Sequence, residues 1–232
     1  MLLESLREYG VDISSGQLNR LLIENQESFH EEKAEVLSTG LSISDYIQAD
    51  DTGARHKGKN GYCTHIGNDF FAWFESTQSK SRINFLELLR AGSTLYGITP
   101  EAISYMKEQK LSSKVVDQLN QSEIRNFEDK SYWDSHLEKL GITSKRHIRI
   151  ATEGVLLGAV LSENNVASDL AVISDDAGQF NILSHGLCWV HAERTIHKLN
   201  AYSDSQKAAL ESIREQIWTL YVSARSLECY YL

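Results

Sequence analysis

Two apolar segments of the chain each end in a pair of aspartates, and this feature most restricts the folds that the sequence can adopt. The segment "ISDYIQA" runs into Asp50 and Asp51, and the apolar run at 170–173 is soon followed by Asp175 and Asp176. A short, uninterrupted apolar run is typical of a strand buried on both faces of a sheet. Carboxylates at the ends of neighbouring strands can converge on one point. The pattern therefore favours an α/β fold that brings Asp50 and Asp175 together.

The N-terminal forty residues have the spacing of a helical hairpin. Residues 1–9 predict a short helix that ends at Gly10, and a second helix is expected from Ser14 or Ser15 to about residue 37. Helix, turn and helix is the outline of a helix-turn-helix, but it is also that of any helical hairpin. Only this region, 1–40, is expected to be separable from the rest.

A change of pattern after Gly40 predicts a sheet. Besides "ISDYIQA", the segments "GYCTHIG" and "DFFAWFES" predict strands, joined as a hairpin by the "IGND" turn. The segment "SRINFLELLRAG" predicts an amphipathic helix that ends at Gly92. The sequence therefore predicts three strands and a helix, with Asp50 at the end of the first strand.

Residues 97–165 have an almost wholly helical pattern. Helices are expected near Pro100, which suits a first helical turn, and at about 111–121, 129–140 and 144–161. The chain after His191 is also expected to be helical, with Leu210, Ile213, Ile217, Leu220 and Ala224 along one face. A long helical insertion thus separates the two acidic strands.

Composition indicates a globular protein of a reducing compartment. Hydrophobic residues make up 41% of the 232 residues, and the three cysteines lack the C-x-x-C spacing of a zinc ribbon. No apolar run approaches the roughly 18–20 residues that span a bilayer, and the N-terminus does not resemble a secretory signal. We therefore expect a cytoplasmic protein without membrane contact.

The net charge of −9 argues against a protein that coats nucleic acid nonspecifically. Local basic clusters could still contact DNA, although an ordinary solvated surface is the commoner explanation for each cluster alone. The three clusters comprise Arg55, His56, Lys57 and Lys59; Lys145, Arg146, His147 and Arg149; and Arg194, His197 and Lys198.

The two acidic strand ends suggest a metal site. Carboxylates held close together repel unless a proton or a cation lies between them, and hard oxygen ligands select Mg²⁺ or Mn²⁺. Two such ions about 3.5–4 Å apart support phosphodiester chemistry. Asp50 and Asp175 are therefore candidate metal ligands, while the alternative is that each Asp-Asp pair caps the turn after its strand.

Three segments, taken in order, resemble the DDE-type insertion-sequence transposases of the IS-sixty-six-like group. "QADDTGARHKGKNGY" is similar to the first acidic motif, and "VISDDAGQFN" to the second, which matches Asp175, Phe180 and Asn181. "LCWVHAERTIHKL" resembles the signature that follows, with Cys188, Trp189, His191 and Arg194. The end of the chain, "EQIWTLYVSARSLECYY", looks like the start of a further helical insertion. The resemblance spans about residues 10–225.

This resemblance implies a ribonuclease-H-like core, a mixed sheet with helices, at 41–200, with an insertion at about 97–165. It makes 1–40 the remnant of an N-terminal region and 201–232 the start of a further helical insertion. It further implies that Asp50 and Asp175 are the first two acids of a catalytic triad that holds two Mg²⁺ or Mn²⁺ ions. The reaction would cleave the phosphodiester at transposon ends and transfer the 3′-hydroxyl to target DNA. The partners would be DNA and other copies of the chain, in the bacterial cytoplasm at the nucleoid.

The third acid of the family, a glutamate in an Asn-x-x-Glu motif, has no counterpart before Leu232. We therefore expect a chain truncated before that acid and impaired in strand transfer. One alternative is a non-catalytic remnant that binds DNA or a full-length transposase and inhibits it. Another is a nuclease completed by Asp51, Asp176 or Glu193, and a third is a helical structural protein.

Cys188 and His191 have the spacing of two zinc ligands, but the sequence contains no second such pair. We expect them to pack beneath Asp175, with Trp189 in the core.

Overall fold

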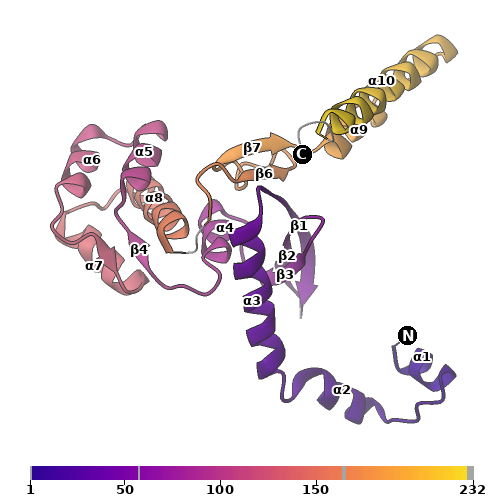
Figure 1. Cartoon of the computed structure of the whole chain (residues 1–232), viewed down its shortest axis with the longest axis horizontal. Coiled ribbons are helices and arrows are strands. Elements are labelled where there is room, and N and C mark those ends of the chain that lie inside the picture. Colours follow the sequence, from indigo (N-terminus) through magenta and orange to yellow (C-terminus); the bar gives the residue numbers. More distant parts are fainter. Residues whose placement is uncertain (1, 57, 164–165, 229–232) are drawn as a thin grey trace.

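The computed structural model describes residues 2–56, 58–163 and 166–228. Its centre is a five-stranded mixed sheet in the order β3-β2-β1-β6-β7, with helices around it (Figure 1). Strands β1, β2 and β3 are antiparallel neighbours, whereas β6 and β7 run parallel to β1. The bounds are Tyr46–His56 for β1, Lys59–Gly67 for β2, Ala72–Thr77 for β3, Ala171–Ser174 for β6 and Ser184–Leu187 for β7. The chain has an α/β fold, as predicted.

Alternation along the strands gives the sheet one buried and one more exposed face. Ile47 and Ala49 of β1 and Ile66 of β2 are buried, whereas Gln48 and Phe74 on the opposite face are exposed. The buried face packs in one hydrophobic cluster with the helices α3 (Glu27–Ile43) and α4 (Arg82–Leu89). The two helices contribute Leu37, Leu41, Phe85, Leu86 and Leu89 to this cluster. The predicted β2–β3 hairpin and the helix that follows it are confirmed.

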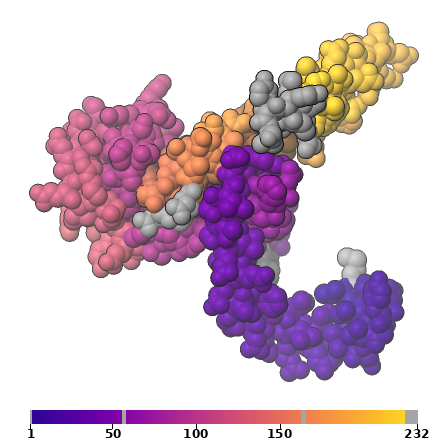
Figure 2. Space-filling view, viewed as in Figure 1, coloured from indigo at the N-terminus to yellow at the C-terminus, as the bar shows by residue number. Residues whose placement is uncertain are grey.

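The N-terminal helices differ from the expected hairpin. Helix α1 (Leu2–Glu8) ends before Gly10, as predicted, and Ser14 caps α2 (Ser15–Ile23) through a capping box with Gln17. The single helix expected to continue to about residue 37 is wrong, because the chain breaks after Ile23 and resumes as α3. Asn25 adopts a left-handed conformation with φ of 56°, which asparagine tolerates better than most residues. Helices α1 and α2 bury no residues and stand away from the body (Figure 2).

Gly40 does not end the helix in which it lies. Helix α3 continues to Ile43, and a Cβ atom at Gly40 would lie 2.7 Å from the ring of Phe71. The glycine therefore permits the close approach of an aromatic ring rather than a turn.

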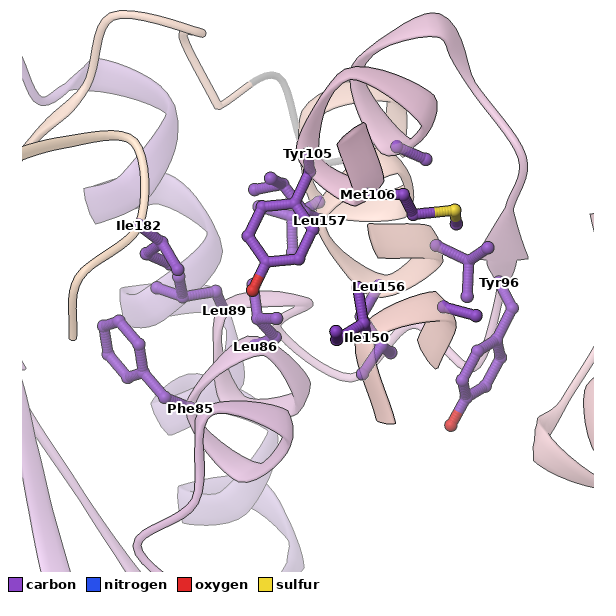
Figure 3. Close-up of a cluster of buried hydrophobic side chains, with 14 of the residues drawn as sticks. Phe85, Leu86, Leu89, Tyr96, Tyr105, Met106, Ile150, Leu156, Leu157 and Ile182 are labelled. Carbon is purple, nitrogen blue, oxygen red and sulfur yellow. The ribbon is translucent and has the colours of Figure 1, made fainter. Parts of the chain in front are cut away.

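The helices expected within 97–165 are confirmed. They are α5 (Pro100–Glu108), α6 (Ser113–Asn120), α7 (Lys130–Lys139) and α8 (Lys145–Glu163). A short pair of strands, β4 (Tyr96–Gly97) and β5 (Asn126–Phe127), was not predicted. Their antiparallel pairing joins the residues just before α5 to those after α6. Side chains from α4, α5 and α8 gather in one buried cluster, which also receives Ile182 from the loop after β6 (Figure 3). The helical region thus shares its core with the sheet.

Two helices complete the described chain. Helix α9 (Trp189–His197) follows β7 directly, and α10 (Asp204–Glu228) packs against α9 and projects from the body (Figures 1 and 2). The apolar face expected on α10 is largely uncovered, since Ile213 and Leu220 are 44% and 60% exposed. None of the helices in the described residues is long and apolar enough to cross a membrane.

Candidate active site

The strand register brings the two predicted acids to neighbouring positions. Strands β1 and β6 pair in parallel, with Tyr46 opposite Ala171 and Gln48 opposite Ile173. Continued at the same offset, this register sets Asp50 beside Asp175, the first residue after β6. Paired residues of neighbouring strands point to the same face of a sheet. Asp50 is exposed and Asp175 is half-buried, so both acids are open to solvent.

Asp50 does not end its strand, contrary to the sequence-based prediction. Strand β1 continues to His56, and the pairing with β2 sets Asp50 opposite His65 and Gly53 opposite Tyr62. Strand β2 keeps the backbone groups of β1 hydrogen-bonded beyond the point where β6 ends. The Asp-Thr-Gly segment at 51–53 therefore forms no turn. The strand instead continues into a two-stranded ribbon.

Asp51 points away from Asp50 and has a structural role. Its Oδ1 accepts a hydrogen bond of 2.6 Å from the Thr64 hydroxyl, and its Oδ2 accepts one of 3.0 Å from the Gln179 amide. Asp51 therefore links β1 to β2 and to the loop at 175–183 that follows β6. It caps no turn, which was the alternative explanation of this acidic pair.

The loop at 175–183 holds Asp175 through local contacts. Asp175 Oδ1 accepts a hydrogen bond of 3.1 Å from the backbone N–H of Ala177. Phe180 is only 1% exposed and packs edge-on against Phe85 of α4, with ring centroids 4.9 Å apart. The aromatic residue of the second motif thus anchors the loop in the core.

Beside Asp175 lies an open cleft of about 480 Å³ between the ends of β6 and β7 and the helix α9. Asp175 and Asp176 line the strand end of this cleft, and it is also lined by Arg194 in the last turn of α9 and by Lys198 directly after that helix. Acidic and basic side chains therefore share the cleft. Arg194 belongs to the third segment of the resemblance and is exposed.

Cys188 and His191 also line this cleft, but Trp189 does not lie in the core as predicted. Trp189 is 40% exposed, and its ring lies 6.1 Å from that of Tyr221 on α10. Because Trp189 is on the side of α9 that meets α10, its apolar surface serves that contact. The Nδ1 of His191 is buried and has no hydrogen-bond partner among the described residues.

Glu193, one of the alternative third acids, faces α10 rather than the cleft. The residue is 7% exposed, and its carboxylate accepts a hydrogen bond from Arg214. That hydrogen bond is the main reason why the pKa of Arg214 is raised, and Glu211 adds to it through an ion pair of 2.7 Å. Glu193 therefore stabilises the contact between α9 and α10 through Arg214.

Asp50 and Asp175 have the chemistry of ligands for a hard divalent cation. One oxygen of Asp50 accepts a hydrogen bond of 2.8 Å from the backbone N–H of Asp51, and one oxygen of Asp175 binds Ala177. These contacts leave the second oxygen of each carboxylate available for a cation. Within residues 2–56, 58–163 and 166–228, however, no group of three acidic, histidine or cysteine side chains could hold a metal ion.

The sequence interpretation missed Gln179 and Arg82, both of which contact this site. The Gly-Gln-Phe run at 178–180 lies within the second acidic motif, so its position in the sequence marked Gln179 as a neighbour of the site. Arg82 is an ordinary helix-start residue in the sequence, and no pattern indicated that it reaches the loop at 175–183.

The sequence matches none of the known protein families with which it was compared. A relative from Sinorhizobium fredii, the uncharacterized protein y4jO, is 34% identical over 195 residues. The match covers 83% of this chain and 60% of the relative, so the chain spans about three-fifths of the length of that protein. No solved structure matches the chain.

Proposed function

We propose that the chain is part of a DNA transposase with a ribonuclease-H-like core, and that Asp50 and Asp175 are two of its metal-binding acids. The observation that carries this proposal is the β1–β6 register, which sets the two acids at neighbouring positions on one face of the sheet. The pairing was expected from two sequence segments far apart in the chain. A helical protein with unrelated acids would have no reason to align them.

The order of the elements supports the ribonuclease-H-like assignment. The resemblance implies three strands, a helix and a later strand that carries the second acid. The chain has β1, β2 and β3, then α4, and then β6 with Asp175 directly after it. Helices α5 to α8 lie between α4 and β6 as an insertion.

In this proposal Asp50 and Asp175 hold Mg²⁺ or Mn²⁺, as their free carboxylate oxygens allow. Such ions activate the attacking oxygen and stabilise the leaving oxygen of a phosphodiester. The two residues supply negative charge at fixed positions, and the exposed face lets a polymer approach them. The substrate would be the DNA of transposon ends and target, in the bacterial cytoplasm, and several copies of the chain would act together.

Two basic surfaces suit a DNA backbone. Arg194 and Lys198 line the cleft that also holds Asp175. Further along β1 from Asp50, the ribbon formed by the ends of β1 and β2 carries Arg55 and Lys59, both exposed. Lys57 of this cluster lies outside the described residues.

The second basic cluster of the sequence has a different role. Arg146 donates hydrogen bonds of 3.1 and 3.2 Å to the carbonyl oxygens of Gln109 and Lys110, and Arg149 pairs with Glu153. These arginines stabilise the helical insertion, so the DNA surface that we propose excludes them.

A second candidate function is a non-catalytic module that binds DNA or another transposase copy. The lack of a third protein ligand near Asp50 and Asp175 within the described ranges favours it. Both functions use the same basic surfaces, and they differ in whether the two acids bind metal.

Metal binding tests the proposal directly. We expect Mn²⁺, followed by electron paramagnetic resonance, to bind the wild-type chain and to lose its site in Asp50→Asn and in Asp175→Asn. Asp176→Asn is the matched control, because this exposed neighbour carries the same charge and is not aligned with Asp50. Binding that survives both of the first two substitutions would exclude the proposed site. Binding of transposon-end DNA without Mn²⁺ binding would support the non-catalytic module instead.

A further inference from the structure

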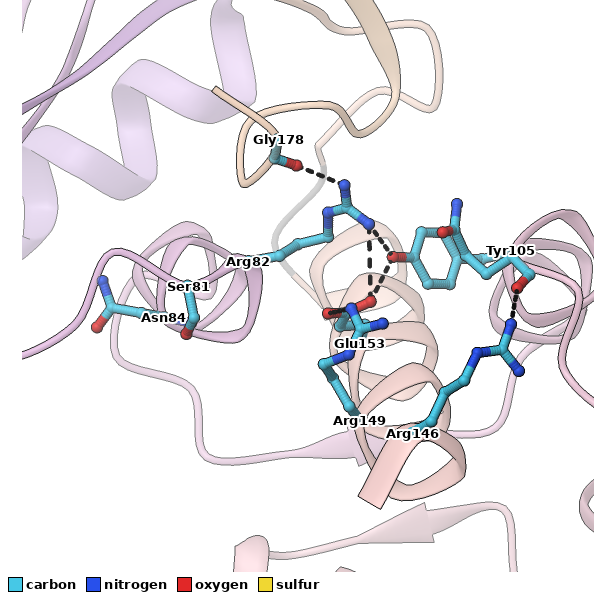
Figure 4. Close-up of polar contacts among 9 residues, drawn as sticks. Ser81, Arg82, Asn84, Tyr105, Arg146, Arg149, Glu153 and Gly178 are labelled. Carbon is cyan, nitrogen blue, oxygen red and sulfur yellow. Dashed lines mark hydrogen bonds and ion pairs between the residues drawn. The ribbon is translucent and has the colours of Figure 1, made fainter. Parts of the chain in front are cut away.

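A buried charged network joins the helical insertion to the loop that carries Asp175 (Figure 4). Arg82 at the start of α4 donates a hydrogen bond of 2.9 Å to the hydroxyl of Tyr105 on α5. That hydroxyl donates one of 2.8 Å to Glu153 of α8, whose side chain is 2% exposed. Arg149 approaches the other oxygen of Glu153 at 3.0 Å. Three side chains, one each from α4, α5 and α8, thus share the Glu153 carboxylate.

The network has one contact outside the helices. The second terminal nitrogen of Arg82, Nη2, donates a hydrogen bond to the carbonyl oxygen of Gly178 in the loop at 175–183. In Figure 4, the Arg82 side chain lies between the loop and the Tyr105–Glu153 pair. A planar guanidinium has donors pointing in fixed directions, so one arginine can serve the loop and the network at the same time.

Arg82 is held in this position by its surroundings. Its side chain is 15% exposed, and Nη1 lies 3.7 Å from Glu153 Oε2. Burial and the Glu153 carboxylate raise the pKa of Tyr105, so this residue remains a neutral hydroxyl that can accept from Arg82. The Nε of Arg82 is buried and has no partner among the described residues, which indicates that the two terminal nitrogens determine where the group lies.

The loop has two further anchors, and all three lie close to the second acid. Gln179 donates to Asp51 at 3.0 Å, and Phe180 packs against Phe85. Arg82 binds the residue directly before Gln179, and only Asp176 and Ala177 separate Gly178 from Asp175. A change in the Arg82 contact therefore acts on the backbone that orients Asp175.

We infer that Arg82 is a positioning residue, which couples the insertion α5–α8 to the orientation of the Asp175 carboxylate. The predicted effect on metal binding rests on the proposed function, whereas the role of Arg82 in holding the loop rests on the contacts alone. Displacement of the insertion by a partner would, through Arg82, change the metal site without touching it.

Hydrogen exchange of the full chain tests the structural part. The reporters are the backbone amides of Ala177, Phe180 and Ile182, which are hydrogen-bonded within the loop. In Arg82→Met, their exchange should rise by roughly tenfold, as expected for the loss of a hydrogen bond from a charged donor. The matched control is Arg149→Met, which removes an arginine from the same carboxylate but leaves the Gly178 contact intact.

A second pair of variants keeps the test decisive if Arg82→Met unfolds. Removal of Arg82 takes away one of the two positive charges beside the buried Glu153 carboxylate. The double variant Arg82→Met/Glu153→Gln therefore also removes the negative charge of Glu153. Its reference is Glu153→Gln. The inference predicts faster loop exchange in the double variant than in this reference, with unchanged exchange in α5–α8.

Equal loop exchange in the double variant and its reference would overturn the inference. So would a rise of the same size throughout α5–α8, because that would indicate a purely structural role. The dissociation constant of Mn²⁺ should rise several-fold in the double variant relative to Glu153→Gln, while that of Arg149→Met stays at the wild-type value. A wild-type chain that binds no Mn²⁺ would contradict the proposed function, and the exchange result would still decide the role of Arg82.

Discussion

Replacement of Gly158 by alanine tests whether the insertion is packed as closely as the structure indicates. An alanine in the middle of a helix normally stabilises it by about 1 kcal/mol relative to glycine. At Gly158, however, the added Cβ would lie 2.7 Å from the carbonyl oxygen of Gly97 and 2.8 Å from the hydroxyl oxygen of Thr99. Because a backbone carbonyl cannot swing away, the cost lies toward the upper part of the roughly 1–3 kcal/mol typical of overpacking. We expect a net loss of about 1–2 kcal/mol in the free energy of unfolding.

Two other helical glycines calibrate this expectation. At Gly40 the clash is with the ring of Phe71, a side chain that can move, and at Gly16 the nearest atom is 4.0 Å away. Urea unfolding followed by circular dichroism should therefore rank the alanine variants, with Gly158→Ala least stable, Gly40→Ala intermediate and Gly16→Ala at or above the wild type. A Gly158→Ala variant as stable as the wild type would refute the close contact between α8 and the β4–α5 segment.

Three further predictions concern the loop, the insertion and the basic ribbon. Phe180→Ala should lower the free energy of unfolding by about 3–5 kcal/mol, because it leaves a cavity beside Phe85 in the core. If urea unfolding showed a loss of stability no larger than that of a surface substitution, the prediction would be wrong. Burial lowers the pKa of His136, so the folded protein should lose stability as pH falls below about 6.5. In thermal unfolding scans, His136→Gln should weaken this pH dependence of stability, and the same pH dependence in both proteins would contradict the prediction. Replacement of Arg55 and Lys59 by alanine should reduce the salt dependence of DNA binding by about one unit of slope per lost phosphate contact, and an unchanged slope in filter binding would exclude the ribbon as a DNA surface.

Local sequence patterns predicted most helices of this chain and the strands β1, β2, β3 and β6, but not β4, β5 or β7. The four helices of the insertion follow their apolar spacing and caps, as at Thr99, which caps α5 directly before Pro100. The continuous apolar run after Leu170 became the strand β6, although only alternate residues of it are fully buried and the expected burial on both faces is not seen. Where prediction failed, a distant contact had replaced the local rule. Gly40 lies within a helix because Phe71 packs on it, and β1 continues past Asp50 because β2 pairs with it.

The two acids of the candidate site were predictable, but their surroundings were not. Asp50 and Asp175 stood out because each follows an apolar segment of the sequence. Nothing in the sequence could indicate that Asp51 would bind Thr64 and Gln179, or that Glu193 would pair with Arg214, since these contacts depend on side-chain directions set by the register and by helix packing. A pair of adjacent acids in a sequence draws attention to a strand, but only the pairing shows where that strand ends and which acid faces the site.

The two acids are held by different parts of the molecule, and this has a consequence for how the site forms. Asp50 lies within β1, whose pairing with β2 depends on residues close in sequence. Asp175 depends on the β1–β6 pairing, on the loop anchors and, through Arg82, on helices α4, α5 and α8. Contacts between residues distant in sequence form late and at an entropic cost, so the half of the site at Asp175 should assemble after the hairpin. We therefore expect the insertion to do more than separate the two acidic motifs, because the loop that carries the second acid should acquire its conformation only when α8 is packed beside α4.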